Sequence, residues 1–452
     1  MSDLAAIEIV ELNGAAAESD AGMIVKGRFE TTGIQPSAPP VGSRNDTVTR
    51  CLDQVHRLLK ETPRGFPAET SPHTIFRIPP PVRGIDPKAE EPEIVSIGPY
   101  HRGRPQVLAF EELKPLFLTR FLRRTRSDLG VLTRLVAGEE SSARTCYSEH
   151  VDMMSADFVQ MMLLDVDPIF ERPQIIPALM RDLVKLENQI PYSLLRLLFN
   201  GVVPPNLKAA TGSLAILAMK LFDLAYPRPM ALLKSYEDLE CEHLLDLFYK
   251  SLSPTGRIHP NSRRESWSSA QSIPSVTELR PSGIKFKSNK ADSLLDISFR
   301  RRVLQIPNIA INDFMTTVLI NSVSLEQCRE NRSRYMTDYV SFMHCLVNQP
   351  KDVSLLRSYG IIALFSHDNQ YVADLFNKLG KSISFNVRDC FLSRQFKELE
   401  SYYCSQRANA MRTYSSSPWS SLSAFSAFLV LFLTFTQTFI ALNSFQCNHP
   451  HH

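Results

Sequence analysis

The sequence predicts a mainly α-helical fold, with a two-lobed soluble body that contains a small β ribbon, followed by one C-terminal transmembrane helix. Three observations lead to this prediction. Apolar residues recur at spacings of three and four over long stretches, alternating apolar and polar runs are few, and residues 422–442 form an apolar stretch without a charged residue. With 452 residues, 44% of them hydrophobic and 21% charged, the chain has ample material for a folded core.

Residues 1–46 predict a disordered acidic and polar extension. The segment is acidic at its start and then rich in Gly, Ser, Thr and Pro, without an apolar period. It also lacks the basic start and the continuous apolar run of a secretory signal peptide, so we expect no such signal.

We expect residues 47–252 to form a helical N-terminal lobe. Its clearest helix begins near Gln174 and is ended or kinked near Gln189 by Pro191. The apolar positions that predict this helix are Ile175, Leu179, Leu183, Leu186 and Ile190, at spacings of 4, 4, 3 and 4. Further helices are expected at 47–60, 110–136, 155–165, 213–225 and 237–252. Closely spaced prolines require an extended or turned chain at 70–105.

A Ser-, Pro- and Arg-rich segment at residues 253–274 predicts a mobile linker. After it we expect a helical C-terminal lobe at 275–412. Its helices are predicted at 313–328, 335–347, 353–365, 371–379 and 385–412. Weak alternation at 275–286 and 294–304 predicts a small hairpin or ribbon.

Residues 419–443 predict the transmembrane helix, which leaves a short tail at 444–452. Leu, Ile, Val and Phe in this stretch outweigh its Ser, Thr and Gln on the membrane-insertion scale, so we expect the lipid bilayer to be one partner of the chain. Lys397, Arg407 and Arg412 precede the span, whereas the residues after it contain no Lys or Arg and only His as a basic type. This asymmetry predicts a tail-anchored protein with a cytosolic body. The flanking charges leave open whether the membrane is the plasma membrane or an endomembrane.

One face of the predicted span is small or polar. Thr434, Gln437 or Thr438, and Ala441 recur at helical spacing, whereas Phe428, Phe432, Phe435 and Phe439 crowd another face. Small and polar residues of this kind favour helix pairing in membranes.

Sequence patterns for catalysis are missing. The chain has no nucleophile elbow, no phosphate-binding loop, no zinc-protease motif and no dinucleotide fingerprint. The eight cysteines contain no CxxC pair and the net charge is only +3, so we expect no metal, no cofactor and no nucleic-acid partner. We assign no catalytic, cofactor-binding or metal-binding residue.

The residues closest to an active-site constellation follow Gly98 and are Tyr100, His101, Arg102 and Arg104, together with Glu187 and Asn188. They are open to two interpretations: a hydrolase or transferase site, or a structural turn, which we favour. Glu187, Asn188 and Gln189 lie between apolar positions, so burial would force them to form hydrogen bonds. We expect these three residues to join the chain before Pro191 to the segment at 94–101, a structural role.

Several blocks resemble, in order, those of the plant-specific family catalogued as domain of unknown function 247. The resemblance begins with IVSIGPYH at 94–101, and DLVKLENQIPYSLL at 182–195 is similar to the family's Leu-Glu-Asn-Gln-Ile-Pro signature. It covers about residues 74–445 and includes DFVQMMLLDVDPIF (157–170), HLLDLFYKSLSP (243–254), LLDISFRRRVLQIPNIAIND (294–313), YMTDYVSFMHCLVNQPKDVSLLRSYGII (335–362) and PWSSLSAFSAFLVLFLTFTQTF (418–439). Val166 and Arg302 stand where the family commonly has Gly.

The resemblance implies a helical, membrane-anchored plant protein without known catalytic residues. It implies a non-enzymatic role in recognition or signalling and a protein partner. Some members in grasses are linked to self-incompatibility as paired pollen-side determinants, so this role and a paired family member as partner are expectations from the resemblance. The alternatives are an enzyme with a site near His101 and Glu187, and an endomembrane scaffold.

Overall fold

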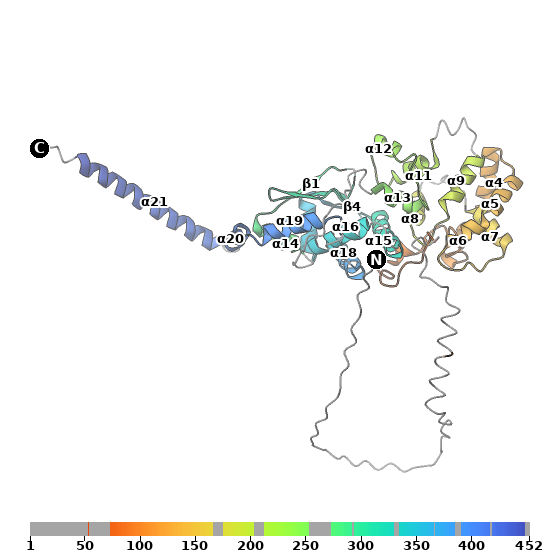
Figure 1. Cartoon of the computed structure of the whole chain (residues 1–452), viewed down its shortest axis with the longest axis horizontal. Helices are drawn as coiled ribbons and strands as arrows, with labels where there is room; N and C mark the ends of the chain where they lie inside the picture. Colours follow the sequence, from red (N-terminus) through yellow and green to blue (C-terminus); the bar gives the residue numbers. More distant parts are fainter. Residues whose placement is uncertain are drawn as a thin grey trace, which may run out of the picture. The chain divides into compact units, whose positions relative to one another are not determined.

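A computed structural model gives the structure of the chain (Figure 1). The chain divides into two units, Met1–Phe66 and Pro67–His452. The structure describes residues 53, 73–165, 175–202, 212–252, 273–291, 293–329, 334–365, 367–384, 390–415 and 418–447. The predicted extension at 1–46, the helix at 47–60 apart from Asp53, and most of the linker at 253–274 lie outside these residues.

The prediction of a mainly helical fold is confirmed. The described helices before residue 253 are α2 (Pro87–Glu90), η1 (Pro105–Val107), α3 (Leu108–Glu111), α4 (Lys114–Thr125), α5 (Leu129–Gly138), α6 (Glu140–Thr145), α7 (Ser155–Leu164), α8 (Ile176–Leu183), α9 (Tyr192–Val202), α11 (Leu214–Phe222), α12 (Met230–Lys234) and α13 (Leu244–Leu252). Those after residue 272 are α14 (Val276–Leu279), η3 (Arg280–Ser282), α15 (Asp313–Cys328), α16 (Tyr335–Leu346), α17 (Pro350–Ser358), α18 (Asn369–Ser382), α19 (Ser393–Tyr403), α20 (Gln406–Ser415) and α21 (Pro418–Cys447).

Two small sheets accompany the helices. In the first, β1 (Lys285–Asn289) runs parallel to β3 (Val303–Pro307), and β2 (Ser298–Arg300) runs antiparallel to β3. In the second, β4 (Ile309–Ile311) pairs in parallel with β5 (Ile362–Leu364). The predicted ribbon therefore exists, but the expected strand at 275–286 was wrong except for Lys285 and Phe286, with which β1 begins. Ser275 and Glu278 form a capping box there and start α14.

The clearest predicted helix was wrong in its extent. Helix α8 ends at Leu183, and the chain then turns instead of continuing to Gln189. The reason is side-chain bonding: the Gln189 amide donates to the carbonyls of Leu183 and Lys185, at 2.7 and 2.9 Å, and thereby replaces the next helical turn. Pro191 consequently does not end this helix but directly precedes α9.

Three other predicted helices were also interrupted. The segment at 110–136 breaks at Arg126, which has a φ of 54°, before α5 begins. The helix expected at 353–365 stops at Ser358, and the chain passes through Gly360, with a φ of 69°, into β5. The described part of 385–412 forms α19 and α20 and not one helix.

Helix α15 lies at the centre of the body. Almost every residue from Phe314 to Glu326 is buried, because α15 packs against α2, α8, α13 and α16. One continuous apolar core joins residues from both predicted lobes, for example Leu186 and Val318. The division into lobes at 47–252 and 275–412 stays a prediction.

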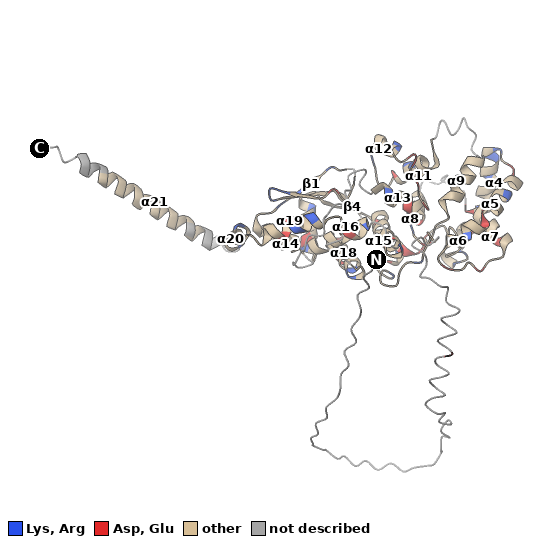
Figure 2. Ribbon diagram, in the orientation of Figure 1, with Lys and Arg blue, Asp and Glu red and all other residues tan. Residues whose placement is uncertain are grey.

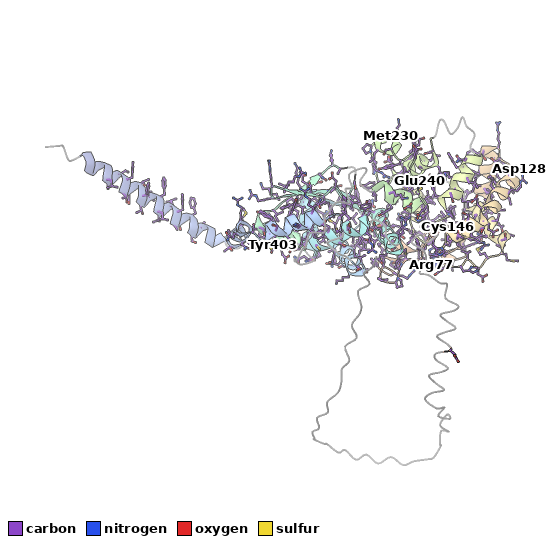
Figure 3. All side chains as sticks on the ribbon, viewed as in Figure 1. Arg77, Asp128, Cys146, Met230, Glu240 and Tyr403 are labelled. Carbon is purple, nitrogen blue, oxygen red and sulfur yellow. The ribbon has the colours of Figure 1, made fainter. Side chains whose placement is uncertain are left out.

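Helix α21 confirms the predicted apolar C-terminal helix. Its segment Phe425–Leu442 has a mean hydropathy of 2.0, is long enough to cross a membrane, and is not buried against any described residue. Figure 2 shows none of the colours of charged side chains along it, and Figure 3 shows its side chains projecting freely. Length and composition thus make α21 a candidate membrane span.

Candidate functional site

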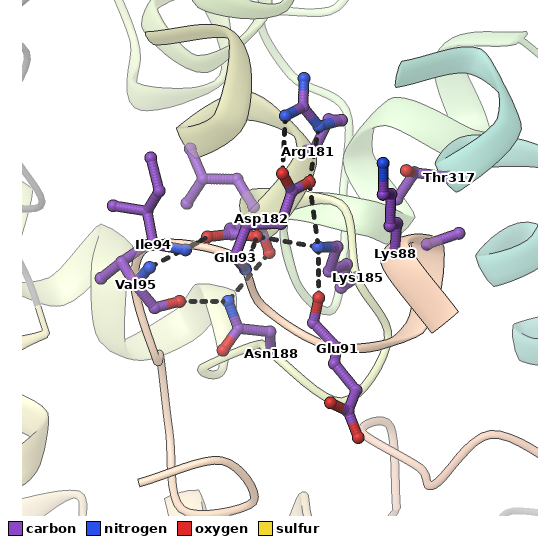
Figure 4. Close-up of polar contacts among 12 residues, drawn as sticks. Lys88, Glu91, Glu93, Ile94, Val95, Arg181, Asp182, Lys185, Asn188 and Thr317 are labelled. Carbon is purple, nitrogen blue, oxygen red and sulfur yellow. Dashed lines mark hydrogen bonds and ion pairs between the residues drawn. The ribbon is translucent and has the colours of Figure 1, made fainter. Parts of the chain in front are cut away.

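The segment at 93–98 belongs to neither a helix nor a sheet, and it is buried from residue 95 onward. Its main-chain groups therefore need partners from side chains. The carboxylate of Asp182, at the end of α8, accepts hydrogen bonds from the amides of Glu93, Ile94 and Val95 at 2.9, 2.8 and 2.9 Å (Figure 4). One side chain thus satisfies three consecutive amides.

Lys185 completes this arrangement from the turn after α8. Its ammonium lies 2.9 Å from Asp182 Oδ1 and donates to the carbonyl of Glu91 at 2.5 Å (Figure 4). Both charged side chains are fully buried. A buried charge is tolerated only when it is paired and hydrogen-bonded, and this pair meets that condition.

Asn188 continues the same pattern. Its side-chain oxygen accepts from the amide of Ile97 at 2.7 Å, and its nitrogen donates to the carbonyls of Val95 and Asp182, both at 3.0 Å. For Asn188, these contacts confirm the expectation that residues 187–189 join the turn before Pro191 to the segment at 94–101. Gln189 departs from it, because its side chain bonds Leu183, Lys185 and Leu245 instead. We call the set Asp182, Lys185 and Asn188 the polar clamp.

A second buried ion pair holds the end of the segment. Asp165 accepts from the amide of Gly98 at 2.8 Å and lies 2.5 Å from the ammonium of Lys114, which also donates to the carbonyl of Ser96 at 2.6 Å. Burial raises the pKa of Asp165, and Lys114 opposes that effect. Gly98 itself has a φ of 74° and passes so close to Gln189 that an added Cβ would lie 2.5 Å from its carbonyl oxygen.

The structure brings His101 and Glu187 together, with 3.4 Å between His101 Nε2 and a Glu187 oxygen. Both side chains are only 1% exposed. Glu187 accepts from the amide of Ile78 at 2.8 Å and from the guanidinium groups of Arg77 and Arg83. Its oxygens are therefore occupied by the scaffold.

Titration of this pair follows from its surroundings. Burial lowers the pKa of His101 to about 4, so the ring is neutral near pH 7. For Glu187, burial raises the pKa, but the hydrogen bonds from Ile78 and Arg83 outweigh it and lower the pKa overall. His101 could exchange a proton only with a group that comes into contact with its ring. Both His101 and Glu187 are buried, so solvent does not reach them directly.

A cavity of about 550 Å³ lies elsewhere, at the start of α2 and α15. It is lined by Ile85, Asp86, Pro87, Lys88, Ala89, Glu93, Arg181, Asp313, Thr317, His367 and Tyr371. Neither His101 nor Glu187 lines this cavity. The enzyme interpretation expects a pocket that joins these two residues.

The polar residues of the cavity bind one another. Arg181 donates to both oxygens of Glu93 at 2.8 and 2.9 Å, and Tyr371 donates to Asp86 at 2.7 Å. The ring of His367 stacks on Tyr371 at 3.9 Å between centroids and lies 3.0 Å from Asp313. Asp86, Glu93 and Asp313 therefore each contact a polar side chain of the same lining.

A hydroxyl of the cavity lining is bonded to the main chain. The Thr317 hydroxyl, the one hydroxyl of a Ser or Thr among the described lining residues, donates to the carbonyl of Asp313 at 2.8 Å. No group of three or more metal-ligating side chains occurs in the described ranges.

Sequence reasoning missed Asp182, Lys185, Asp165 and Lys114. Each pairs with main chain far away in the sequence, so spacing gave no sign of the partner. The available signal was local: Asp182 and Lys185 interrupt an apolar stripe, where an unpaired charge would be costly.

Comparison with known proteins places the chain. The sequence model of the family described as plant protein of unknown function, domain of unknown function 247, matches residues 75–167 and 165–433. The UPF0481 protein At3g47200 of Arabidopsis thaliana is 28% identical, over 82% of this chain and 86% of the relative. The putative UPF0481 protein At3g02645 of the same plant is 21% identical, over 86% of this chain and 94% of the relative. No solved structure matches. With its buried LENQIP turn and IVSIGPYH segment in the family's order, the chain belongs to the domain of unknown function 247 family of plant proteins.

Proposed function

We propose that the protein is a non-enzymatic recognition or signalling protein, anchored in a membrane by α21, whose helical body faces the cytosol and binds a protein partner. The observation that carries this proposal is the exposed apolar segment Phe425–Leu442, because such a surface is unfavourable in water and favourable in a bilayer. Lys397, Arg407 and Arg412 on one side of the span support the cytosolic orientation.

The buried polar groups support a role without catalysis. The carboxylate oxygens of Glu187 and Asp182 accept hydrogen bonds from main-chain amides and from basic side chains of the body. A catalytic carboxylate would instead face a cavity that a substrate can enter. The competing proposal, a hydrolase or transferase near His101 and Glu187, requires that such an opening form.

A narrower version of the proposal is a pollen-side self-incompatibility determinant of a grass, acting with a paired family member. Its support is the family resemblance alone, and it expects allelic differences on exposed residues and not within the polar clamp. A scaffold at an endomembrane would share the anchor but would lack a variable partner.

Protease protection of the full chain, tagged at both termini, tests the orientation. In sealed microsomes, we expect added protease to remove the N-terminal tag and to spare the C-terminal tag behind the membrane. Protection of the N-terminal tag, with glycosylation at Asn45 or Asn331, would overturn the cytosolic orientation.

A His101→Ala variant tests the alternative. If any measured turnover of the protein disappeared while its melting temperature stayed unchanged, the enzyme would replace the non-enzymatic proposal. A His150→Ala variant is a matched control, because His150 is exposed on the same part of the body.

A further inference from the structure

We propose that α21 pairs with α21 of a second copy of this chain inside the bilayer, through a hydrogen bond between the two Gln437 side chains. The inference rests on the proposed membrane span and adds a partner to it. Three observations support it: the hydrogen bonds of the polar side chains in the helix, the chemistry of the carboxamide, and the shape of the helix face.

The hydroxyl groups of α21 are satisfied within their own helix. Thr434 donates to the carbonyl of Val430 at 2.8 Å, and Thr438 donates to that of Thr434 at 2.8 Å. Thr436 donates to the carbonyls of Phe432 and Leu433 at 3.0 and 2.8 Å. Each of these hydroxyls therefore already donates a hydrogen bond within its own helix. It needs no partner from a second helix in the hydrocarbon of the membrane.

Gln437 differs from them. Its side chain is exposed, and neither a hydrogen bond nor an ion pair of its carboxamide occurs among the described residues. At 1.5 Å per residue, Gln437 lies roughly 7 Å inside the end of the segment Phe425–Leu442, within the hydrocarbon. An amide without hydrogen bonds is costly in such surroundings, so a partner for Gln437 is strongly favoured.

The carboxamide selects a second copy as that partner. It carries both a donor nitrogen and an acceptor oxygen, so two identical groups facing each other across a twofold axis satisfy one another. No charge on the described part of α21 opposes its association with an identical helix. A span of different sequence would need a matching polar group at the same depth.

The shape of the helix favours contact on the same face. At 3.6 residues per turn, Thr434 and Ala441 lie beside Gln437, and both are small enough for close approach of two backbones. The four phenylalanines lie on the opposite side of the helix, toward lipid: Phe428, Phe432, Phe435 and Phe439. Gln437 therefore lies between two small residues on the side of the helix away from the phenylalanines, where a second helix can approach.

The test uses the full chain in phosphatidylcholine vesicles, with donor and acceptor dyes on the N-termini of two populations. Energy transfer is measured as lipid is added, which gives the association constant within the membrane. We expect transfer in the natural chain that falls with dilution. Gln437→Leu should lower the association constant about three- to twentyfold, the range measured for hydrogen bonds between membrane helices.

Two further variants isolate the carboxamide. Thr434→Val keeps the shape of the same face and removes a hydroxyl that bonds only its own helix, so the association constant should stay within about twofold. Gln437→Asn keeps the carboxamide and should retain more association than Gln437→Leu.

Three results would overturn the inference: no energy transfer in the natural chain at any dilution, equal association of Gln437→Leu and the natural chain, or equal losses in Gln437→Leu and Thr434→Val. Extraction with alkaline carbonate distinguishes the failure of the membrane span itself. A chain released by carbonate does not span the membrane, which overturns the anchor and the pairing together, whereas a retained chain without transfer overturns the pairing alone.

Discussion

Asp182 and Lys185 form an ion pair of 2.9 Å in which neither side chain is exposed to solvent. The pair lies three residues apart at the end of α8, yet its main effect is on the segment at 93–95, which it holds through three amides. The block at 182–195, which contains Asp182, Lys185 and Asn188, thus supplies hydrogen-bond partners to the main chain of a segment that has no sheet partner.

Replacing Asp182 tests this explanation. Asp182→Ala leaves three main-chain amides and the buried ammonium of Lys185 without their acceptor, so we expect the free energy of unfolding to fall by about 3–5 kcal/mol. Denaturant unfolding of the full chain in detergent measures the change. Asp374→Ala is the control, because Asp374 is exposed on α18, and it should cost less than about 0.5 kcal/mol. Similar midpoints for both variants would contradict the clamp.

Gly98 provides a test of the close approach beside the clamp. Gly98→Ala puts a Cβ 2.5 Å from the Gln189 carbonyl oxygen and 2.9 Å from the Tyr147 hydroxyl, at a φ of 74°. Gly103→Ala has a similar φ of 78° and open space around it, so it measures the backbone cost alone, about 1–2 kcal/mol. We expect Gly98→Ala to destabilise the chain by at least about 2 kcal/mol more in denaturant unfolding. Equal losses would mean that the segment can move away from Gln189.

The sequence predicted some elements closely and misjudged others for a physical reason. Helix α15 was predicted with its observed bounds, because a continuous run of helix-compatible residues is a local signal; in the structure Asn312 caps its start. Helix α8 was predicted too long, because Leu186 and Ile190 keep the helical spacing although they lie in a turn. These two positions are apolar because they are buried. Burial alone does not distinguish a helix from a well-packed turn.

The site depended on contacts that no local pattern contains. The link from Asn188 to the segment at 94–101 was predicted, because residues 187–189 lie between apolar positions and must form hydrogen bonds where they are buried. The link from Leu186 to Asn321 was not, since the two residues are 135 positions apart and each is unremarkable by itself. The cavity beside Tyr371 combines four separate segments and leaves no trace in their spacing.

His243 predicts a loss of stability in acid. Its Nδ1 accepts from the amide of Asp246 at 3.2 Å, so the proton lies on Nε2, which donates to the carbonyl of Thr74 at 3.0 Å. Burial lowers the pKa of His243 to about 4, below the ordinary 6.5 of the unfolded chain. The unfolded chain therefore binds more protons below pH 6.5, and the stability contributed above that pH is lost as pH falls toward 4.

Unfolding at pH 7.5 and pH 5 measures this effect. The natural chain should lose about 2 kcal/mol more than His243→Gln between the two pH values. Asp338 acts with the opposite sign, since burial raises its pKa to about 7 and its contribution to stability falls as pH rises from about 4 to 7. Because Asp338 is present in both chains, it cancels in the difference. Identical pH profiles of the two chains would show that His243 is not buried as a neutral ring.

The turn between β2 and β3 gives the last prediction. Arg301 and Arg302 form its two central residues and have φ values of 50° and 69°, a conformation that Asn and Gly adopt far more readily than Arg. Both side chains are exposed, so a substitution removes no packing. Arg302→Gly should raise the free energy of unfolding by about 0.5–1 kcal/mol, because relief of the strained backbone exceeds the added freedom of Gly in the unfolded chain. Arg300→Gly, in the extended strand, should instead lower it by a similar amount. Of the two positions, only Arg302 has a positive φ. If the free energy of unfolding changed in the same direction in both variants, a positive φ at Arg302 would be contradicted.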